Sequence, residues 1–451
     1  MLRAEGVRAV AIVNMHHLKP QASSRKPRRL LRRGVESLVV LSIATLLAHA
    51  FLIDGWLVPC VVSSGSMAPT LLGPHRAARC SACGMPLVCD ADELTVDSLV
   101  CPNCGWPNNP LDPRTLAGDR LLIDRATLGV RPPRRWEVVV FRCSGHARDY
   151  CVKRIVGLPG ETVEIRDGDV YIDGQIAHKT LKQQRAMAIL VHDSVYRDPH
   201  LPPRWRPEGA RSAWQPTTDG GWNFRQNTAD VSSPADWLTY VHCRREVGSP
   251  ETTEEIPIRD DDPYNPGASR RLNDVADLLL VARLQLSGSG SLWLRASDGG
   301  EVFQLEIQPL SGRVVLQRDG KKVQASQLAA RLLGRSVELV LSTFDQQVLL
   351  AIDGRVELAF DYRRSDGPLR PVSRPLAIGA NDLEVTIQRL QVYRDIYYTP
   401  STHPANTLAR QLGPDEYFIL GDNSPISVDS RSWMGGETVR GSQFVGRPLA
   451  R

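Results

Sequence analysis

The chain has 451 residues, 42% of them hydrophobic, and it carries a formal net charge of +5. That length allows roughly two to four domains, and the hydrophobic content is sufficient for a sizeable core. The mild charge, with no helix-turn-helix or stacked-aromatic pattern, argues against nucleic acid as a partner.

The basic charge is concentrated at the amino terminus. Residues 1–34 carry nine Lys and Arg residues against one acid, Glu5, and residues 35–58 are mostly apolar. Three interpretations of this pattern are open: a cleaved signal peptide, a buried core helix and an uncleaved membrane anchor. The flanking basic block favours the anchor, because such a block stays in the cytoplasm. We therefore predict one transmembrane helix in the lipid bilayer of the inner (plasma) membrane, with everything after it extracytoplasmic.

After this segment the pattern becomes that of a β protein. Residues 118–176 contain five runs of β-branched and apolar residues separated by Gly, Pro and Asp turns, which predicts a sheet with hairpins. Residues 186–262 are polar and rich in Pro, Trp and Asp, and they predict no clear elements. Residues 272–396 contain about nine short apolar runs, which predicts a β-sandwich. The last 40 residues return to strands and turns.

One serine and one lysine have the surroundings that nucleophilic catalysis needs. A serine attacks only when a base removes its proton, and a lysine can be that base when burial removes its charge. Ser66 lies in a Gly-Ser turn, and Lys153 lies in an apolar run between Val152 and Val156. Taken singly, a turn serine and a strand lysine whose amine reaches solvent are the plainer interpretations. The ten histidines show no recognisable catalytic motif.

The text around these two residues adds a family resemblance. Four blocks in chain order resemble the boxes of the type I signal peptidases, the leader peptidases with a Ser/Lys dyad: Ser64–Leu71, Gly118–Ile123, Tyr150–Glu161 and Gly421–Arg431. The resemblance implies a serine endopeptidase in which Ser66 attacks the scissile carbonyl and Lys153 is the general base. It also implies an all-β catalytic core that needs no cofactor for catalysis.

The same resemblance assigns roles to the residues around the pair. It implies that the Ser64 hydroxyl and the Ser66 N–H form the oxyanion hole, and that Ser427 hydrogen-bonds and orients the lysine. Asp429 and Arg431 are implied to form a structural ion pair near the site, with Asp422 as a further helper. The implied substrates are secretory preproteins with small residues at the −1 and −3 positions of the cleavage site.

Two departures from the family pattern stand in these boxes. Ile426 occupies a position where asparagine is common, and Ser63 stands where many relatives have proline. Neither change removes a group that the resemblance implies in catalysis.

The cysteines predict a metal site. The chain has nine, and four of them form two Cys-x-x-Cys pairs separated by 17 residues: Cys80, Cys83, Cys101 and Cys104. This spacing is typical of a zinc ribbon, in which four thiolates bind a structural Zn²⁺ in a closed tetrahedral site. Two disulfides, or thiols without a role, are the alternatives. Cys143 and Cys151 could pair across neighbouring strands, and Cys89 and Cys243 have no obvious partner.

The sandwich has a looser resemblance of its own. The runs 337–341 and 348–354 resemble those of a concanavalin-like or laminin-G-like domain. Such a domain could bind a glycan or an envelope protein, although a fold alone does not define a function. The acidic run 260–262 could bind calcium, and a solvated loop is the plainer interpretation.

We therefore predict a mainly β protein in which a catalytic core is interrupted twice. Its segments are a basic cytoplasmic amino terminus (1–34), a transmembrane anchor (35–58), the core in three parts (59–75, 117–185 and 399–451), a zinc-ribbon insertion (76–116) and an inserted sandwich domain (186–398). A self-cleaving Ser/Lys protease of the repressor type and a non-catalytic membrane receptor are the rival hypotheses. The predicted anchor and the missing DNA-binding domain disfavour the first, and the intact Ser66, Lys153 and Ser427 disfavour the second.

Overall fold

The computed structural model describes most of the chain. The described residues are 26–49, 55–91, 99–108, 114–143, 150–225, 235–246, 249–261, 264, 271–364, 370–400, 409–433 and 438–449. The chain divides into two compact units, Met1–Leu57 and Val58–Arg451. The first unit contains helix α1 (Lys26–Ala48), and the second contains the sheets.

The predicted transmembrane helix over 35–58 is not found. Among the residues that the structure describes, no helix is long and apolar enough to cross a membrane. Arg32, Arg33 and Glu36 lie within α1, so its uncharged part runs only from Ser37 to Ala48, whereas a bilayer needs about 20 apolar residues. Strand β1 already begins at Leu57, and residues 50–54 of the predicted anchor lie outside the described part.

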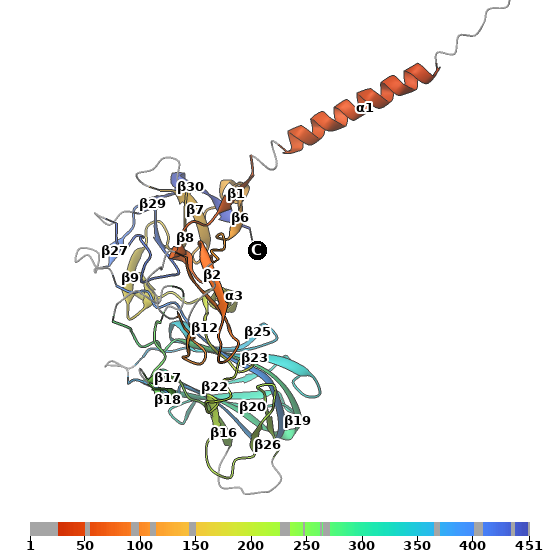
Figure 1. Ribbon diagram of the computed structural model, residues 1–451. Coiled ribbons are helices and arrows are strands. Elements are labelled where there is room, and N and C mark those ends of the chain that lie inside the picture. The colour runs from red at the N-terminus through yellow and green to blue at the C-terminus, as the bar shows by residue number, and fades with distance from the viewer. Residues whose placement is uncertain are drawn as a thin grey trace, which may run out of the picture. The chain divides into compact units, whose positions relative to one another are not determined.

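A seven-stranded sheet gathers strands from distant parts of the chain. It is built from β1 (Leu57–Val61), β6 (Arg120–Asp124), β7 (Val138–Arg142), β8 (Tyr150–Gly157), β28 (Glu416–Leu420), β29 (Val439–Arg440) and β30 (Phe444–Pro448). The strand order is β1-β6-β30-β7-β8-β28-β29. Figure 1 shows the blue carboxyl-terminal β30 among the orange strands of the first third of the chain. The sheet is therefore completed only by the last segment of the chain.

A smaller sheet follows directly from the Asp-Gly turns of the sequence. Its strands are β9 (Thr162–Arg166), β10 (Asp169–Ile172), β11 (Gln175–Ile176) and β27 (Arg410–Gln411), in the order β11-β10-β9-β27. Asp167 and Asp173 have φ values of 50° and are each followed by a glycine with positive φ, as tight hairpin turns require. Helix α3 (Leu181–Met187) comes next and begins with a capping box from Thr180 and Gln183.

Two short hairpins carry the paired cysteines. The first consists of β2 (His75–Arg79) and β3 (Pro86–Asp90), and the second of β4 (Leu99–Val100) and β5 (Pro107–Asn108). Cys80 N donates to Met85 O, and Cys101 N donates to Trp106 O, so the two turns repeat one backbone pattern.

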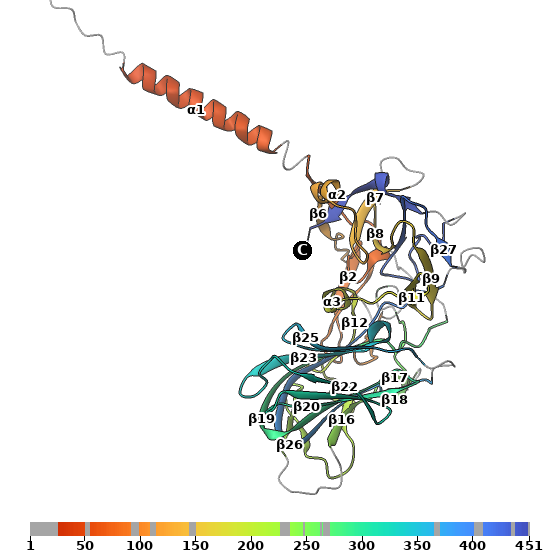
Figure 2. The ribbon, with the colours of Figure 1, turned by 180° about the vertical axis from the view of Figure 1, so that it is seen from behind.

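The inserted domain is a β-sandwich built on two very long strands. These are β19 (Leu278–Ser297) and β26 (Leu376–Arg394), which pair antiparallel along almost their whole length and lie side by side in Figures 1 and 2. Their register shifts between Gly288 and Ser291, because the chain bends there from one layer to the other.

Each half of the long pair recruits its own neighbours. Residues 279–285 of β19 pair with β23 (Ser336–Ser342), followed by β24 (Gln347–Ile352) and β25 (Arg355–Asp361). Residues 292–297 pair with β20 (Val302–Gln308), followed by β21 (Arg313–Arg318) and β22 (Lys321–Gln327). Alternate side chains of both layers, such as Leu339, Leu350, Leu305 and Leu316, are fully buried in one core.

The described part of the region 186–262 contains seven strands, which the sequence did not predict. They are β12 (Ile189–Asp193), β13 (Trp205–Pro207), β14 (Trp214–Pro216), β15 (Trp222–Phe224), β16 (Asp236–Tyr240), β17 (Cys243–Glu246) and β18 (Ser249–Glu255). Trp205, Trp214 and Trp222 belong to the sandwich core. β13, β14 and β15 have three residues each, which is too short to show a period of two.

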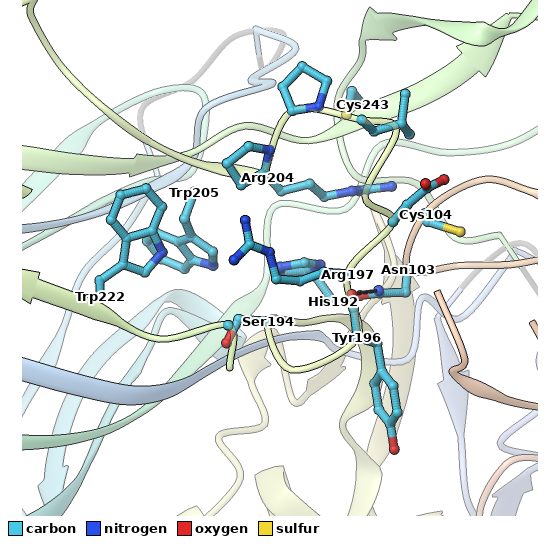
Figure 3. A pocket seen from close by; sticks show the side chains of 15 residues that line it. Asn103, Cys104, His192, Ser194, Tyr196, Arg197, Arg204, Trp205, Trp222 and Cys243 are labelled. Carbon is cyan, nitrogen blue, oxygen red and sulfur yellow. Dashed lines mark hydrogen bonds between the residues drawn. The ribbon is translucent and has the colours of Figure 1, made fainter. Parts of the chain in front are cut away.

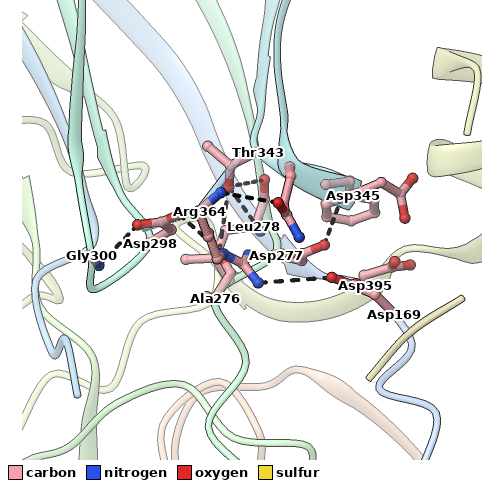
Figure 4. Close-up of polar contacts among 12 residues, drawn as sticks. Asp169, Ala276, Asp277, Leu278, Asp298, Gly300, Thr343, Asp345, Arg364 and Asp395 are labelled. Atoms are coloured by element: carbon pink, nitrogen blue, oxygen red, sulfur yellow. Dashed lines mark hydrogen bonds and ion pairs between the residues drawn. The ribbon is translucent and has the colours of Figure 1, made fainter. Parts of the chain in front are cut away.

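Buried ion pairs join the sandwich to the smaller sheet and α3. Figure 4 shows Arg364 beside Asp277 and Asp298. Arg364 Nη2 lies 2.5 Å from Asp277 Oδ1, and Nε lies 3.1 Å from Asp298 Oδ2. Lys179, just before α3, pairs with Asp345 and, at 2.7 Å, with Asp395. We call the group Lys179, Arg364, Asp277, Asp298, Asp345 and Asp395 the junction cluster.

Candidate catalytic site

The nucleophile turn is a short 3-10 helix, η2 (Gly65–Met67), with Ser66 at its centre. The closing segment of the chain holds it: Asn423 N donates to Ser66 O at 3.1 Å, and Asn423 Nδ2 donates to Gly65 O at 3.1 Å. A Cβ on Gly421 would lie 2.5 Å from Ser66 O and 2.1 Å from Ser427 Oγ. Only glycine therefore lets the two segments approach so closely.

Lys153 lies in β8, opposite Val139 of β7, with its amine directed at the nucleophile. Lys153 Nζ donates to Ser66 Oγ at 2.6 Å, and the lysine is 6% exposed. Burial lowers the pKa of Lys153 to about 8, although the nearby charges of Asp429 and Asp422 oppose the shift. The structure thus joins the two residues that the sequence analysis singled out, and near neutral pH it leaves a larger fraction of the amine uncharged and able to accept a proton than in an exposed lysine.

A cleft opens in front of this pair. It is lined by Ser63, Ser64, Gly65, Ser66, Pro74, Asp90, Cys143, Cys151, Lys153, Ile426, Val428 and Trp433. Ser64 Oγ lies 3.3 Å from Ser66 Oγ and is on the exposed side of the turn. The reacting groups are therefore accessible to a polypeptide, with one more hydroxyl beside the nucleophile.

Two buried ion pairs surround the site. Arg154, next to Lys153, binds Asp422 through two hydrogen bonds of 2.7 and 2.5 Å. Arg431 binds Asp429 through two hydrogen bonds of 2.9 and 2.7 Å. Burial acts to raise the pKa of Asp429, but the Arg431 charge and hydrogen bonds outweigh it, and the pKa is lowered. Asp422 is therefore tied to Arg154, whose part the sequence analysis missed.

The hydrogen bond expected from Ser427 to Lys153 is absent from the described residues. Ser427 Oγ is buried and faces the backbone at Gly421, while the hydrogen bond recorded for Lys153 Nζ goes to Ser66. Ser427 is therefore adjacent to the nucleophile turn but does not orient the lysine in this structure.

A disulfide borders the cleft. Cys143, which follows β7, is bonded to Cys151 in β8, two residues before Lys153. This pairing was one possibility in the sequence, and the structure adopts it.

The four paired cysteines meet in one buried cluster. Their sulfur atoms all lie within 4.8 Å of one another, including Cys80 to Cys104 at 3.5 Å and Cys83 to Cys101 at 3.7 Å. Hydrogen bonds from Cys101 and Cys104 lower the pKa of the Cys83 thiol to about 2. The cluster has the donor set and closed geometry that structural zinc requires.

The acidic run 260–262 is described only at its first two residues. Asp260 is 3% exposed and accepts hydrogen bonds from Asn273 N and Nδ2, so it braces a loop. Asp261 is exposed, and Asp262 lies outside the described residues.

The fold and site define a β-sheet protein with a buried lysine and an accessible serine in one cleft. Comparison with known families matches residues 86–214 to "Signal peptidase, peptidase S26". The matched segment contains Lys153 but neither Ser66 nor the closing box.

Curated relatives agree with that family. A probable signal peptidase I-2 from Synechocystis is 35% identical over 75 residues, which cover 16% of this chain and 34% of the relative. Signal peptidase I from Leptolyngbya laminosa is 33% identical over 76 residues, with 15% and 37% covered. The chain thus spans about a third of the length of these relatives.

Solved structures resemble the chain more distantly. The carbohydrate binding module CBM66 from Bacillus subtilis is 9% identical, with 42% of this chain and 95% of that chain covered and a TM-score of 0.27. A Bacillus subtilis protein of unknown function with a galectin-like fold is 10% identical, with 46% and 96% covered and a TM-score of 0.30. Neither likeness is close enough to support a conclusion about this chain.

Proposed function

We propose that the chain is a serine endopeptidase of the signal peptidase I type, with Ser66 as nucleophile and Lys153 as general base. The observation that carries the proposal is the 2.6 Å hydrogen bond between Lys153 Nζ and Ser66 Oγ, made by a lysine that is 6% exposed. The similarity of residues 86–214 to signal peptidases supports it.

The chemistry follows from this contact. Neutral Lys153 takes the Ser66 proton as Ser66 Oγ attacks the scissile carbonyl carbon. The resulting oxyanion is stabilised by the Ser66 N–H and the Ser64 hydroxyl, which lies on the same turn. The protonated lysine then gives its proton to the leaving amine, and an acyl-enzyme on Ser66 remains. A water molecule, deprotonated by Lys153, hydrolyses that ester and restores both residues.

The other predicted residues take structural parts in this proposal. The Asp429–Arg431 and Asp422–Arg154 pairs fix the closing segment that holds the nucleophile turn. Ser427 contributes by packing beside Gly421, next to that turn.

The substrates that we propose are secretory preproteins with small residues at −1 and −3. The names of the curated relatives support this class. The exposed Ser64 side of the cleft leaves room for an extended peptide. A glycan or envelope protein on the sandwich, and contact with a lipid bilayer, stay predictions of the sequence.

We also propose that Cys80, Cys83, Cys101 and Cys104 bind one structural Zn²⁺. Four buried sulfurs within 4.8 Å of one another support this, together with Asn103 Nδ2, which lies 3.7 Å from Cys83 Sγ as an outer hydrogen-bond donor. The ion would stabilise the two hairpins and takes no part in peptide hydrolysis.

The test is cleavage of a purified preprotein with alanine at −1 and −3. Ser66→Ala and Lys153→Ala should each lower the cleavage rate by about 10³-fold or more, because nucleophile and base act as a unit. The matched controls are Ser287→Ala and Lys182→Ala, which change exposed residues away from the site and should leave the rate unchanged. Normal cleavage by a folded Ser66→Ala or Lys153→Ala protein would refute the proposal.

A further inference from the structure

A small cavity lies where the inserted domain meets the second cysteine hairpin. Figure 3 shows Asn103 and Cys104 of that hairpin facing His192, Arg197 and Arg204 of the inserted domain. The space inside it that is open to water is about 50 Å³. Nothing in the proposed peptidase reaction uses this cavity.

Arg204 is the unusual residue in its wall. The side chain is buried, with 7% of the residue exposed. Its hydrogen bonds in the described residues use only Nη1, which donates to His242 Nδ1 at 2.9 Å and to Tyr240 OH at 3.4 Å. The Nε and Nη2 groups therefore remain for the cavity, and together they form the edge that binds carboxylate or phosphate oxygens in pairs.

No acid of the described chain neutralises this guanidinium. Asp198 lines the same cavity but is paired with Arg245, and Asp193 is paired with Arg389. The acceptor His242 is kept neutral, since burial and the Arg204 charge hold its pKa well below the usual value. Burying a cation without a counter-ion costs free energy, so binding of an anion beside Arg204 would stabilise the site.

The rest of the cavity suits a small anionic ligand. His192 Nδ1 and Trp205 Nε1 are buried and have no hydrogen-bond partner in the described structure. Arg197 is exposed at the cavity and adds a second positive charge. Leu201 and Trp222 supply apolar wall, which excludes water and strengthens the attraction between opposite charges.

We propose that this cavity binds a small ligand through a carboxylate or phosphate oxyanion, which accepts hydrogen bonds from Nε and Nη2 of Arg204. Arg197 attracts the ligand at the entrance. The inserted domain thereby carries a ligand site of its own, separate from the Ser66–Lys153 cleft.

The competing explanation is that thiolates neutralise Arg204. Cys104 and Cys243 line the same cavity, and their charges act on Arg204. If that were the whole role of Arg204, its loss would weaken metal retention by the cysteines, and no anion would bind.

The test is titration calorimetry of the full chain with inorganic phosphate, sulfate and acetate. We expect one site per chain for at least one of these anions, and Arg204→Met should weaken binding at least tenfold. Arg204→Lys keeps the charge but lacks the paired donors, so it should weaken binding at least threefold. Arg211→Met, which removes an exposed arginine outside the cavity, should stay within twofold. Tighter binding of phosphate or of acetate identifies which oxyanion the site prefers.

A second measurement needs no variant. In crystals of the unmodified chain grown with selenate, the anomalous signal of selenium should lie within hydrogen-bonding distance of Arg204. The proposal is overturned if no anion binds, if Arg204→Met binds as tightly as the original chain, or if selenate occupies only other places. Loss of zinc from Arg204→Met without any anion binding in the original chain would establish the thiolate explanation instead.

Discussion

The chemistry of Lys153 depends on a balance between burial and two neighbouring acids. Asp429 and Asp422 favour the charged amine, but each is already bound by its own arginine, Arg431 and Arg154. Their attraction for Lys153 is therefore largely offset, and burial dominates the pKa. The two ion pairs thus do more than brace the backbone, because they keep the acids from holding the proton on the lysine.

The pH dependence of cleavage should report this balance. With a pKa of about 8, about a tenth of Lys153 is neutral at pH 7, and the neutral fraction increases as the pH rises. Because the base must be neutral, kcat/KM should rise tenfold per pH unit below 8 and level off above it. The measurement is kcat/KM of preprotein cleavage between pH 5 and 10, and a curve that keeps rising toward 10.5 would contradict the burial argument.

At the scale of residues, the sequence predicted which residues lie together better than how their side chains are oriented. Ser66 and Lys153 were singled out because their Gly-Ser turn and apolar run lie within blocks that resemble those of the type I signal peptidases. The contact of Asn423 with the nucleophile turn was not predictable. It depends on how two distant segments pack together, and no local sequence pattern encodes that packing. The orientation of the Ser427 hydroxyl could not be predicted for the same reason, because it depends on packing against Gly421.

At the scale of elements, the junction cluster decides whether the sandwich is attached firmly. Lys179 is 4% exposed and pairs with Asp345 and Asp395, while its amine also lies 4.8 Å from the Trp136 ring centroid. Trp136 O in turn accepts a hydrogen bond from Arg154, the neighbour of Lys153. The sandwich is therefore in contact, through Lys179 and Trp136, with the strand that carries the proposed general base.

Removing the lysine should loosen this attachment. Lys179→Met leaves two buried carboxylates without a counter-ion, which costs about 3–5 kcal/mol and should lower the melting temperature by roughly 5 °C in a unit of this size. The matched control is Arg185→Met, which breaks the Arg185–Glu338 pair between α3 and β23. Both partners are over a third exposed, so the loss should be at most about 1 kcal/mol. Equal melting temperatures for the two variants in calorimetry would show that the junction cluster does not stabilise the attachment of the sandwich.

Strand prediction succeeded or failed according to turn chemistry. β9 and β10 were predictable because Asp167-Gly168 and Asp173-Gly174 define where each strand stops. β13, β14 and β15 were not, because three-residue strands are fixed by their partners, here β16, β15 and β26, and not by their own sequence.

At the scale of the whole molecule, the hairpins that carry the cysteine cluster are hydrogen-bonded to the inserted sandwich domain. Asn103, between two of the cysteines, donates to Tyr196 O at 2.7 Å and accepts from Asp193 N at 2.8 Å. Arg245 Nε donates to Cys104 O at 3.0 Å, and its guanidinium stacks 4.8 Å from the Trp106 ring. The shape of the second hairpin therefore determines whether these contacts with the inserted domain can form.

Removal of the metal should consequently increase hydrogen exchange in the inserted domain as well as in the hairpins. We expect about one zinc per chain by inductively coupled plasma mass spectrometry. The Cys101→Ser variant should lose this zinc, because a structural site needs all four thiolates. Chelation should increase amide hydrogen exchange at Asp193, whose backbone N–H donates to Asn103 Oδ1 on the second hairpin. The control Cys60→Ser changes a cysteine outside the cluster and should keep both the zinc and the protection. Zinc loss with unchanged exchange at Asp193 would show that the hairpin holds its shape without the ion, and that the link is made by the polypeptide alone.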